Sequence, residues 1–299
     1  MSVVKLGLAL GSGSSRGLAH IGVLKVFERE GINIDLIAGT SIGALIGGAY
    51  AAGISAARME EIALSVDIKK LISLVDIAAP STALVNGKKV EAFIRKIIGD
   101  KDFNELNAPF ACVATDVNSG REVVLCEGDV VTAIRASIST PVVFAPMIKG
   151  ESLLVDGGVL NPLPVDIAKK MGSDVVIGVS VSGVPKVTMA PVYSNGSGDM
   201  ETGTIRRPGF PKIVYSRIAI QVKRMLPTLT IYQLATTSVG LMQRELSGIK
   251  LQAADIIIAP QIDDVYFYSF HEAKMIITGG EKAAEKAVDD IKKIISRKS

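Results

Sequence analysis

The stretch that most constrains this chain runs from Leu36 to Gly53 and reads L-I-A-G-T-S-I-G-A-L-I-G-G-A-Y-A-A-G. A short apolar run meets the pentapeptide G-T-S-I-G, and a run of small, helix-compatible residues follows. This order predicts a strand, a tight turn and a helix, with Ser41 at the apex of the turn. Gly39 and Gly43 let the turn pass close to its neighbours, and the helix N-terminus stabilises negative charge beside Ser41. The pattern therefore predicts that Ser41 is a nucleophile.

Two other interpretations of this stretch are open. The motif G-x-S-x-G also arises by chance in chains of ordinary composition. Residues 36–54 carry no charge, are about as long as a membrane span, and contain Gly43-x-x-x-Gly47, so they also fit a helix that crosses a bilayer. The stretch is rich in Gly and Ala rather than Leu, and nothing else in the chain resembles a membrane topology. These features favour the strand, turn and helix.

The composition is that of a globular chain. Its 299 residues are 48% hydrophobic and 21% charged, which allows a sizeable core in one large α/β domain or two small ones. A net charge of +3 does not indicate nucleic acid, and the absence of Trp argues against an aromatic-lined carbohydrate surface. The first residues lack the long apolar region and cleavage site of a signal peptide. We therefore expect a cytoplasmic protein.

The cysteines and histidines are few and widely spaced. Cys112 and Cys126 flank a predicted hairpin turn at Asn118-Ser119-Gly120, so they could face each other across two strands. In the cytoplasm, buried thiols are expected rather than a disulfide. Two His and two Cys residues show no metal-ligand spacing, so we expect neither a metal nor a cofactor.

A glycine-rich loop separates the first predicted strand, residues 3–10, from a helical pattern over residues 18–30. A strand, a glycine loop and a helix form an anion-binding device, and two uses of it are open. In a dinucleotide site, Asp35 would bind the ribose, although it precedes the second strand instead of following it. In an acyl-transfer enzyme the loop would be an oxyanion hole, and the predicted turn on the next strand favours this use. The loop residues are Gly11, Ser12, Gly13, Ser14, Ser15, Arg16 and Gly17.

Three motifs in a fixed order make the chain resemble a known family. G-S-G-S-S-R-G-L-A-H-I-G-V-L is followed by D-L-I-A-G-T-S-I-G-A-L and, after a later strand, by D-G-G. This order is similar to that of the patatin-like phospholipases, above all their soluble bacterial members. The resemblance implies an α/β protein with a three-layer α/β/α fold, a mainly parallel central sheet and a Ser-Asp dyad that hydrolyses lipid acyl esters. Serines replace some glycines of the family's loop, which leaves the oxyanion donors open, and Arg16 either adds positive charge there or braces the loop.

Two aspartates are candidates for the base of that dyad. Asp156 and Asp116 each follow a predicted strand, and sites in α/β sheets gather at the carboxyl ends of strands. Spacing alone favours neither residue. The family resemblance selects Asp156, because its D-G-G motif continues into Gly157 and Gly158.

The reaction implied by the resemblance is a two-step acyl transfer. Asp156 would deprotonate Ser41, and amides of the glycine loop, together with the amide of Ile42, would hold the oxyanion. Most serine hydrolases use histidine as the base, so His20, just inside the helix after the loop, and His271 are further candidates.

The character of the chain changes after residue 182. We expect a catalytic core over residues 5–182, an exposed loop over 183–210, and a C-terminal helical region over 211–299 that packs on the same domain. Arg206 to Arg224 is basic and amphipathic, so it either packs on the core, covers the site, or docks on anionic lipid and makes the protein peripheral at a membrane. The Lys-rich terminal helix is expected to be solvated.

Together these patterns predict a serine hydrolase of lipid acyl esters. A lipid-binding or regulatory module on the same fold is the alternative from another class, and a dinucleotide-binding enzyme is the lesser one. Phospholipids, lysophospholipids and simple carboxylesters all fit as substrates. The oligomeric state stays open.

Overall fold

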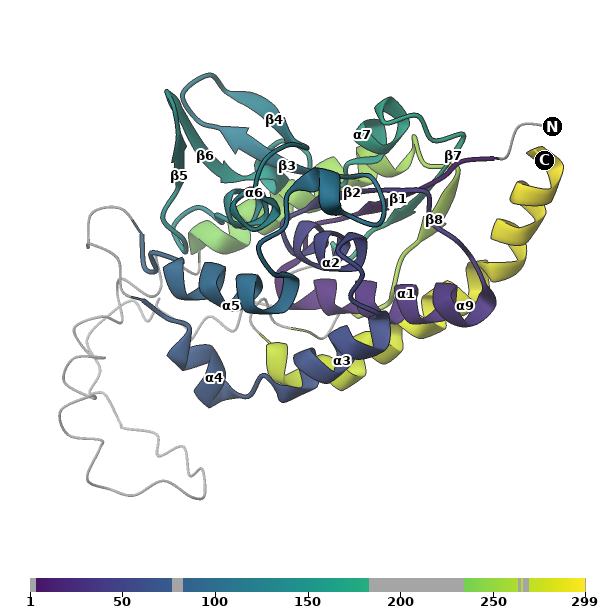
Figure 1. Ribbon diagram of the computed structural model, residues 1–299, viewed down its shortest axis with the longest axis horizontal. Helices are drawn as coiled ribbons and strands as arrows, with labels where there is room; N and C mark the ends of the chain where they lie inside the picture. The colour runs from purple at the N-terminus through teal and green to yellow at the C-terminus, as the bar shows by residue number, and fades with distance from the viewer. Residues whose placement is uncertain (1–3, 77–82, 183–233, 263–264, 266–268, 299) are drawn as a thin grey trace, which may run out of the picture.

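An eight-stranded mixed sheet forms the centre of the molecule (Figure 1). The computed structural model describes residues 4–76, 83–182, 234–262, 265 and 269–298. The strands are β1 (Leu6–Leu10), β2 (Leu36–Thr40), β3 (Phe110–Asp116), β4 (Arg121–Leu125), β5 (Met147–Lys149), β6 (Ser152–Asp156), β7 (Val175–Val179) and β8 (Ile256–Ile258). Their order is β5-β6-β3-β2-β1-β7-β8, and β4 pairs with β3 outside this path. The pairs from β3 through β2, β1 and β7 to β8 are parallel, whereas β4, β5 and β6 add antiparallel pairs.

Helices cover both faces of this sheet. They are α1 (Ala19–Glu30), α2 (Ile42–Ala51), α3 (Ala56–Ser65), α4 (Ile68–Ser73), α5 (Lys88–Ile98), α6 (Val130–Ser137), α7 (Val165–Lys170), α9 (Ala273–Lys298) and a further helix at 234–251. Short 3₁₀ turns lie at η1 (Ser14–Leu18), η2 (Phe103–Glu105), η3 (Gly157–Val159) and η4 (Phe270–Glu272).

The central strands are buried on both faces, and their side chains alternate between two apolar cores. On β1, Leu6, Leu8 and Leu10 enter the core shared with α1, α2 and α9, whereas Ala9 enters the core shared with α7. Figure 1 shows α1, α2 and α9 on one side of the sheet and α7 on the other. The predicted three-layer α/β/α fold is therefore confirmed.

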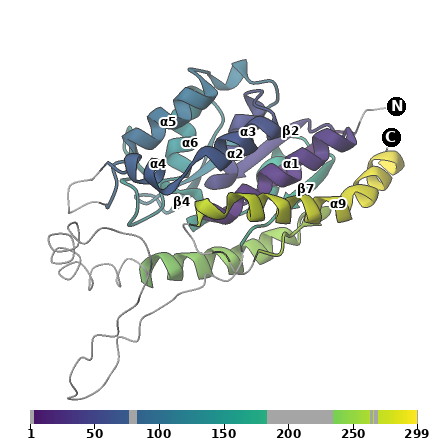
Figure 2. The same cartoon turned by 90° about the horizontal axis from the view of Figure 1, so that it is seen from below.

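The terminal helix α9 lies directly beside α1 (Figure 2). The two backbones approach so closely that a Cβ on Gly22 would overlap the carbonyl oxygen of Ile277, and one on Gly280 that of Ala19. The α9 side chains of Ile277 and Ile291 are fully buried in the main core. The expectation of a solvated terminal helix is therefore wrong for the apolar face of α9, although Lys274, Lys282, Lys286, Lys292 and Lys293 are exposed.

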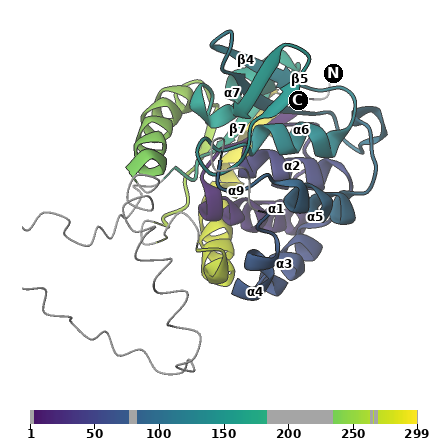
Figure 3. The ribbon, with the colours of Figure 1, turned by 90° about the vertical axis from the view of Figure 1, so that its left-hand side faces the viewer.

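Helices α3, α4 and α5 pack beyond α2, away from the sheet (Figure 3). Ser55 caps α3 by accepting from the amide of Arg58, and Asp67 caps α4 by accepting from the amide of Lys70. The carboxylate of Asp76 accepts from the amides at the start of α5, which ties the end of the α4 segment to α5. We refer to α3, α4 and α5 together as the roof.

Two interpretations of the sequence are contradicted by these elements. Residues 36–54 do not form a span, because β2 ends at Thr40 and α2 covers only Ile42–Ala51. No helix in the described part of the chain is both long and apolar enough to cross a bilayer. The expected pair of buried thiols is half right: Cys112 is buried on β3, whereas Cys126 is exposed just past β4.

The helix at 234–251 lies on the α7 side of the molecule (Figure 3). Its Leu251 packs against the apolar core that contains Leu163 and Val165. The expectations for residues 183–210 and for Arg206 to Arg224 concern positions outside the described residues.

Candidate active site

Ser41 lies at a sharp turn between β2 and α2. Its backbone has φ of 57° and ψ of −123°, a conformation that non-glycine residues rarely adopt. The turn needs glycine on both sides, because a Cβ on Gly39 would stand 2.5 Å from the carbonyl oxygen of Gly43, and one on Gly43 would overlap that of Leu10. The predicted strand, turn and helix around Ser41 are therefore present.

Ser41 and Asp156 meet although 115 residues separate them. The Ser41 hydroxyl donates to Asp156 Oδ2 at 2.6 Å, and both side chains are buried. The sheet register explains the meeting: β3 pairs Val113 with Thr40 of β2 and the next residue, Ala114, with Asp156 of β6. Ser41 and Asp156 thus lie at one level along β3.

Three donors surround the Asp156 carboxylate. Besides the Ser41 hydroxyl, the amide of Gly158 donates to Oδ1 at 2.8 Å, and the Thr140 hydroxyl donates to Oδ2 at 3.0 Å. Burial raises the pKa of Asp156 above its ordinary value, and these hydrogen bonds act against that rise. Asp156 is thereby a stronger base than a free aspartate while its geometry stays fixed.

Asp116, the rival candidate, has a different environment. Its carboxylate accepts from the Ser119 hydroxyl at 2.8 Å and from the amides of Asn118 and Leu153. These hydrogen bonds, with that from Ser119 the strongest, lower the pKa of Asp116. Asp116 therefore acts as the capping residue of the β3–β4 turn.

The glycine loop packs against the turn that carries Ser41. A Cβ on Gly17 would overlap the Ile42 side chain, so the loop lies directly on the start of α2. Two of its amides are already used, because Gly11 donates to Val179 at 3.0 Å and Ser12 donates to Pro162 at 2.8 Å. The expectation that the whole loop supplies oxyanion donors is therefore too broad.

Other amides near Ser41 remain available. Within the described residues, no acceptor takes the amide of Gly13 or that of Ile42. The amide of Ser41 itself donates to the Ser137 hydroxyl at 2.9 Å, and that hydroxyl donates to the Val113 carbonyl oxygen. Of the other loop residues, Ser14, Ser15, Arg16 and Gly17 form η1, and the Arg16 side chain is buried.

Neither histidine is hydrogen-bonded to Ser41. His20 is fully buried and its Nε2 donates to the Gly11 carbonyl oxygen at 2.8 Å, while burial lowers its pKa to about 4. It is thus a neutral ring that holds the glycine loop. His271 lies beside Glu272 on η4 and its side chain is 54% exposed.

Asp35 does not lie where a dinucleotide site would need an acidic ligand for the ribose. The Asp35 carboxylate accepts from the amide of Leu6 at 2.6 Å, at the start of β1 and so at the opposite end of that strand from the glycine loop. In the parts of the chain that the structure describes, no cluster of three or more His, Cys, Asp or Glu side chains could hold a metal ion.

Sequence reasoning missed three polar residues around the site. Thr140 and Ser137 hold the Asp156 side chain and the Ser41 amide, as described above. Gln243 comes from the helix at 234–251 and is buried: Ser12 Oγ donates to its Oε1 at 3.4 Å, and a Cβ on Gly158 would come within 2.5 Å of its Nε2. Gln243 thus connects the glycine loop to the Asp-Gly-Gly turn, and no local sequence signal marks it.

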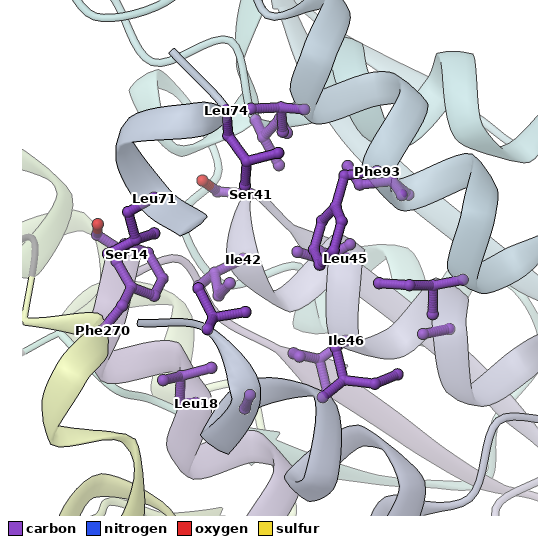
Figure 4. A pocket seen from close by; sticks show the side chains of 18 of the residues that line it. Ser14, Leu18, Ser41, Ile42, Leu45, Ile46, Leu71, Leu74, Phe93 and Phe270 are labelled. Carbon is purple, nitrogen blue, oxygen red and sulfur yellow. The ribbon is translucent and has the colours of Figure 1, made fainter. Parts of the chain in front are cut away.

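An apolar cavity of about 420 Å³ lies against Ser41. Figure 4 shows Ser41 and Ser14 among side chains of α2 and the roof, such as Leu45, Leu74 and Phe93. A cavity of this size is typical of small-molecule sites. Because its walls are almost wholly apolar, it suits a hydrocarbon chain whose polar end meets Ser41.

The sequence of this chain matches a known family. Residues 8–169 match the sequence model of the patatin-like phospholipase family. The chain belongs to the patatin-like phospholipase family.

The relatives differ in how much of their length is matched. An uncharacterized NTE family protein of Mycobacterium bovis is 38% identical over 182 residues, which are 60% of this chain and 49% of that protein. Lysophospholipase nte1 of Emericella nidulans is 33% identical over 206 residues, 66% of this chain and 13% of that protein. The chain thus spans about half the length of the mycobacterial relative. The crystal structure of VipD from Legionella pneumophila has a similar fold, with a TM-score of 0.52 at 11% identity over 97% of this chain and 67% of VipD.

Proposed function

We propose that this chain is a serine hydrolase of lipid acyl esters in which Ser41 is the nucleophile and Asp156 the base. The observation that carries the proposal is the 2.6 Å hydrogen bond from Ser41 to Asp156 at the wall of an apolar cavity. The family and the relative named as a lysophospholipase support a lipid hydrolase.

The reaction begins with proton transfer from Ser41 to Asp156. The Ser41 oxygen attacks the ester carbonyl carbon, and a tetrahedral intermediate forms. Amides without another acceptor, those of Gly13 and Ile42, donate to its oxyanion. When the intermediate collapses, the proton held by Asp156 passes to the leaving alcohol, and an acyl-enzyme remains. Water then loses a proton to Asp156 and attacks the acyl carbon. As the bond between that carbon and the Ser41 oxygen breaks, the proton passes from Asp156 to Ser41 and the fatty acid leaves.

Substrate position follows from the cavity. The acyl chain lies along the apolar side chains of α2 and the roof, which places the carbonyl carbon beside Ser41. Burial of each methylene contributes about 0.8 kcal/mol to binding. A simple carboxylester and a lysophospholipid share this acyl chain, so both are expected to be hydrolysed.

Hydrolysis by histidine variants tests the proposal. His20→Gln keeps a donor for the Gly11 carbonyl, and His271→Ala removes an exposed ring, so both variants should hydrolyse p-nitrophenyl esters and lysophosphatidylcholine at near wild-type rates. Strong loss of activity in either variant that keeps its fold would contradict an aspartate base. A wild-type chain that binds lipid without hydrolysing it would instead be a binding module.

A further inference from the structure

The roof carries apolar side chains on its outer surface as well as on its cavity wall. On α4, Leu71 lines the cavity whereas Ile72 is 66% exposed. Leu64 at the end of α3 and Leu84 before α5 are also exposed. Val75 lines the cavity and is itself 45% exposed. The apolar outer surface is therefore continuous with the cavity at Val75.

Four lysines lie on the same helices of the roof as these apolar side chains or next to them in the chain. Lys69 and Lys70 lie on α4, Lys88 and Lys89 lie at the start of α5, and all four are exposed. The two pairs are neighbours in space, because Lys89 Nζ donates to the Val75 carbonyl oxygen at 3.3 Å. We name Leu64, Ile72, Val75, Leu84, Lys69, Lys70, Lys88 and Lys89 the roof patch.

The roof-patch lysines differ from several lysines of α1 and α9. Lys25 and Lys274 both pair with Glu60, and Lys292 pairs with Glu30. In the described residues none of the four roof-patch lysines forms a salt bridge. The nearby carboxylates of Asp67 and Asp76 accept from backbone amides instead. These two carboxylates stay charged and offset part of the lysine charge, so four lysines against two aspartates leave this surface with a net positive charge.

We propose that the roof patch docks on an anionic phospholipid surface. The exposed apolar side chains would enter the acyl region, and the lysines would meet lipid phosphates. Docking there presents the mouth of the cavity to the membrane, so an acyl chain reaches Ser41 without crossing water. This use of the cavity rests on the proposed function, whereas docking itself does not.

Charge favours a membrane over a second copy of the chain. In a two-fold symmetric dimer the same patch meets itself, so four lysines would face four lysines. An anionic surface is complementary to both the charge and the apolar centre. We therefore expect the roof patch to bind an anionic lipid surface. Dimerisation through the patch would overturn this proposal.

Vesicle sedimentation tests docking independently of catalysis. The full chain carrying Ser41→Ala should sediment with phosphatidylcholine vesicles that contain phosphatidylglycerol and less with pure phosphatidylcholine. Adding Lys69→Glu and Lys88→Glu should weaken binding to the anionic vesicles at least about tenfold, and Ile72→Glu should weaken it too. The matched control, Lys282→Glu with Lys286→Glu, makes the same charge change on exposed positions of α9 and should leave binding unchanged.

The possible failures are distinguishable. Equal loss of binding in the α9 control, or patch variants that bind as tightly as the parent, would overturn the docking proposal. So would a patch variant that changes the oligomeric mass in light scattering. In the chain with intact Ser41, the Lys69→Glu, Lys88→Glu variant should still hydrolyse a short water-soluble ester at the wild-type rate. If the wild-type chain lacks that activity, the proposed function fails, while the vesicle result still decides docking.

Discussion

The floor of the site, at the carboxyl ends of β2 and β6, and the roof are built in opposite ways. On the floor, polar groups are held by directional hydrogen bonds: Ser41 by Ser137, and Asp156 by Thr140 and the amide of Gly158. Ser41 even keeps a strained backbone. The roof consists of short helices whose apolar side chains meet the cavity without directional bonds.

This difference indicates that the floor performs the chemistry and the roof binds the acyl chain. Chemistry depends on atoms fixed to within a few tenths of an ångström, so the floor should tolerate almost no change. Apolar contact is non-directional, so the roof should tolerate changes of size and alter which acyl chain is accepted. Substitutions on the floor should therefore cost more activity than substitutions in the roof.

The largest effect is expected at the nucleophile. Ser41→Ala removes the attacking oxygen and should lower kcat for ester hydrolysis by about 10⁵-fold or more, by analogy with other serine hydrolases. Steady-state kinetics on a p-nitrophenyl ester measures this loss. Ser65→Ala, which removes an exposed hydroxyl on α3, is the matched control and should retain full activity.

The base gives the next effect. Asp156→Asn keeps the shape but cannot take the proton, so kcat should fall about 10³- to 10⁴-fold. Asp116→Asn makes the same change at the β3–β4 turn. It should lower the stability of the fold modestly and leave kcat near the wild-type value. The reverse ranking of these two variants would reassign the base.

A smaller effect is expected at the residue that holds the base. Thr140→Val removes a hydrogen bond to the ionised carboxylate, so kcat/KM should fall about tenfold. Because burial already raises the pKa of Asp156 and this bond opposes the rise, its loss raises the pKa further. The base must be ionised, so activity falls as pH drops through this pKa, and the acid limb should move to higher pH.

A matched control separates this effect from simple destabilisation. Thr115→Val removes a buried hydroxyl that has no hydrogen-bond partner among the described residues. It should leave the pH profile in place. An unmoved acid limb in Thr140→Val would show that Thr140 does not tune the base.

The smallest effect on chemistry is expected in the roof. Ala63→Phe adds a ring to the cavity wall on α3 and should displace about one methylene of a long acyl chain, which lowers kcat/KM for long-chain esters about fourfold. Short-chain esters should be unaffected. Ala57→Phe adds the same ring at an exposed position of α3 and should change neither. An equal loss of kcat/KM for short-chain and long-chain esters would mean that the roof tolerates substitution no better than the floor.

Local patterns predicted much of the floor. The turn at Ser41 and the glycine loop are each contained in a few consecutive residues whose glycines are required by close backbone contacts. Asp156 needed the family resemblance, because its place beside Ser41 depends on the register of β6 along β3. Spacing could not distinguish it from Asp116.

The parts that were missed depend on tertiary contact. Thr140 and Gln243 come from distant elements, and neither has a neighbouring motif that signals a role. Packing of the C-terminal region was predicted only in general terms, because the many lysines of α9 masked the helical spacing of apolar residues such as Ile277, Ala284 and Ile291. The helical spacing of these apolar residues, considered apart from the lysine content, predicts the buried face of α9.

The central claim is that Ser41 is the activated nucleophile, and covalent labelling tests it most directly. A fluorophosphonate reacts only with an activated serine, and mass spectrometry of the digested chain locates the adduct. We expect one adduct on Ser41 in the wild-type chain, much slower labelling in Asp156→Asn, and none in Ser41→Ala. An adduct on another residue, or undiminished labelling of folded Ser41→Ala, would contradict it.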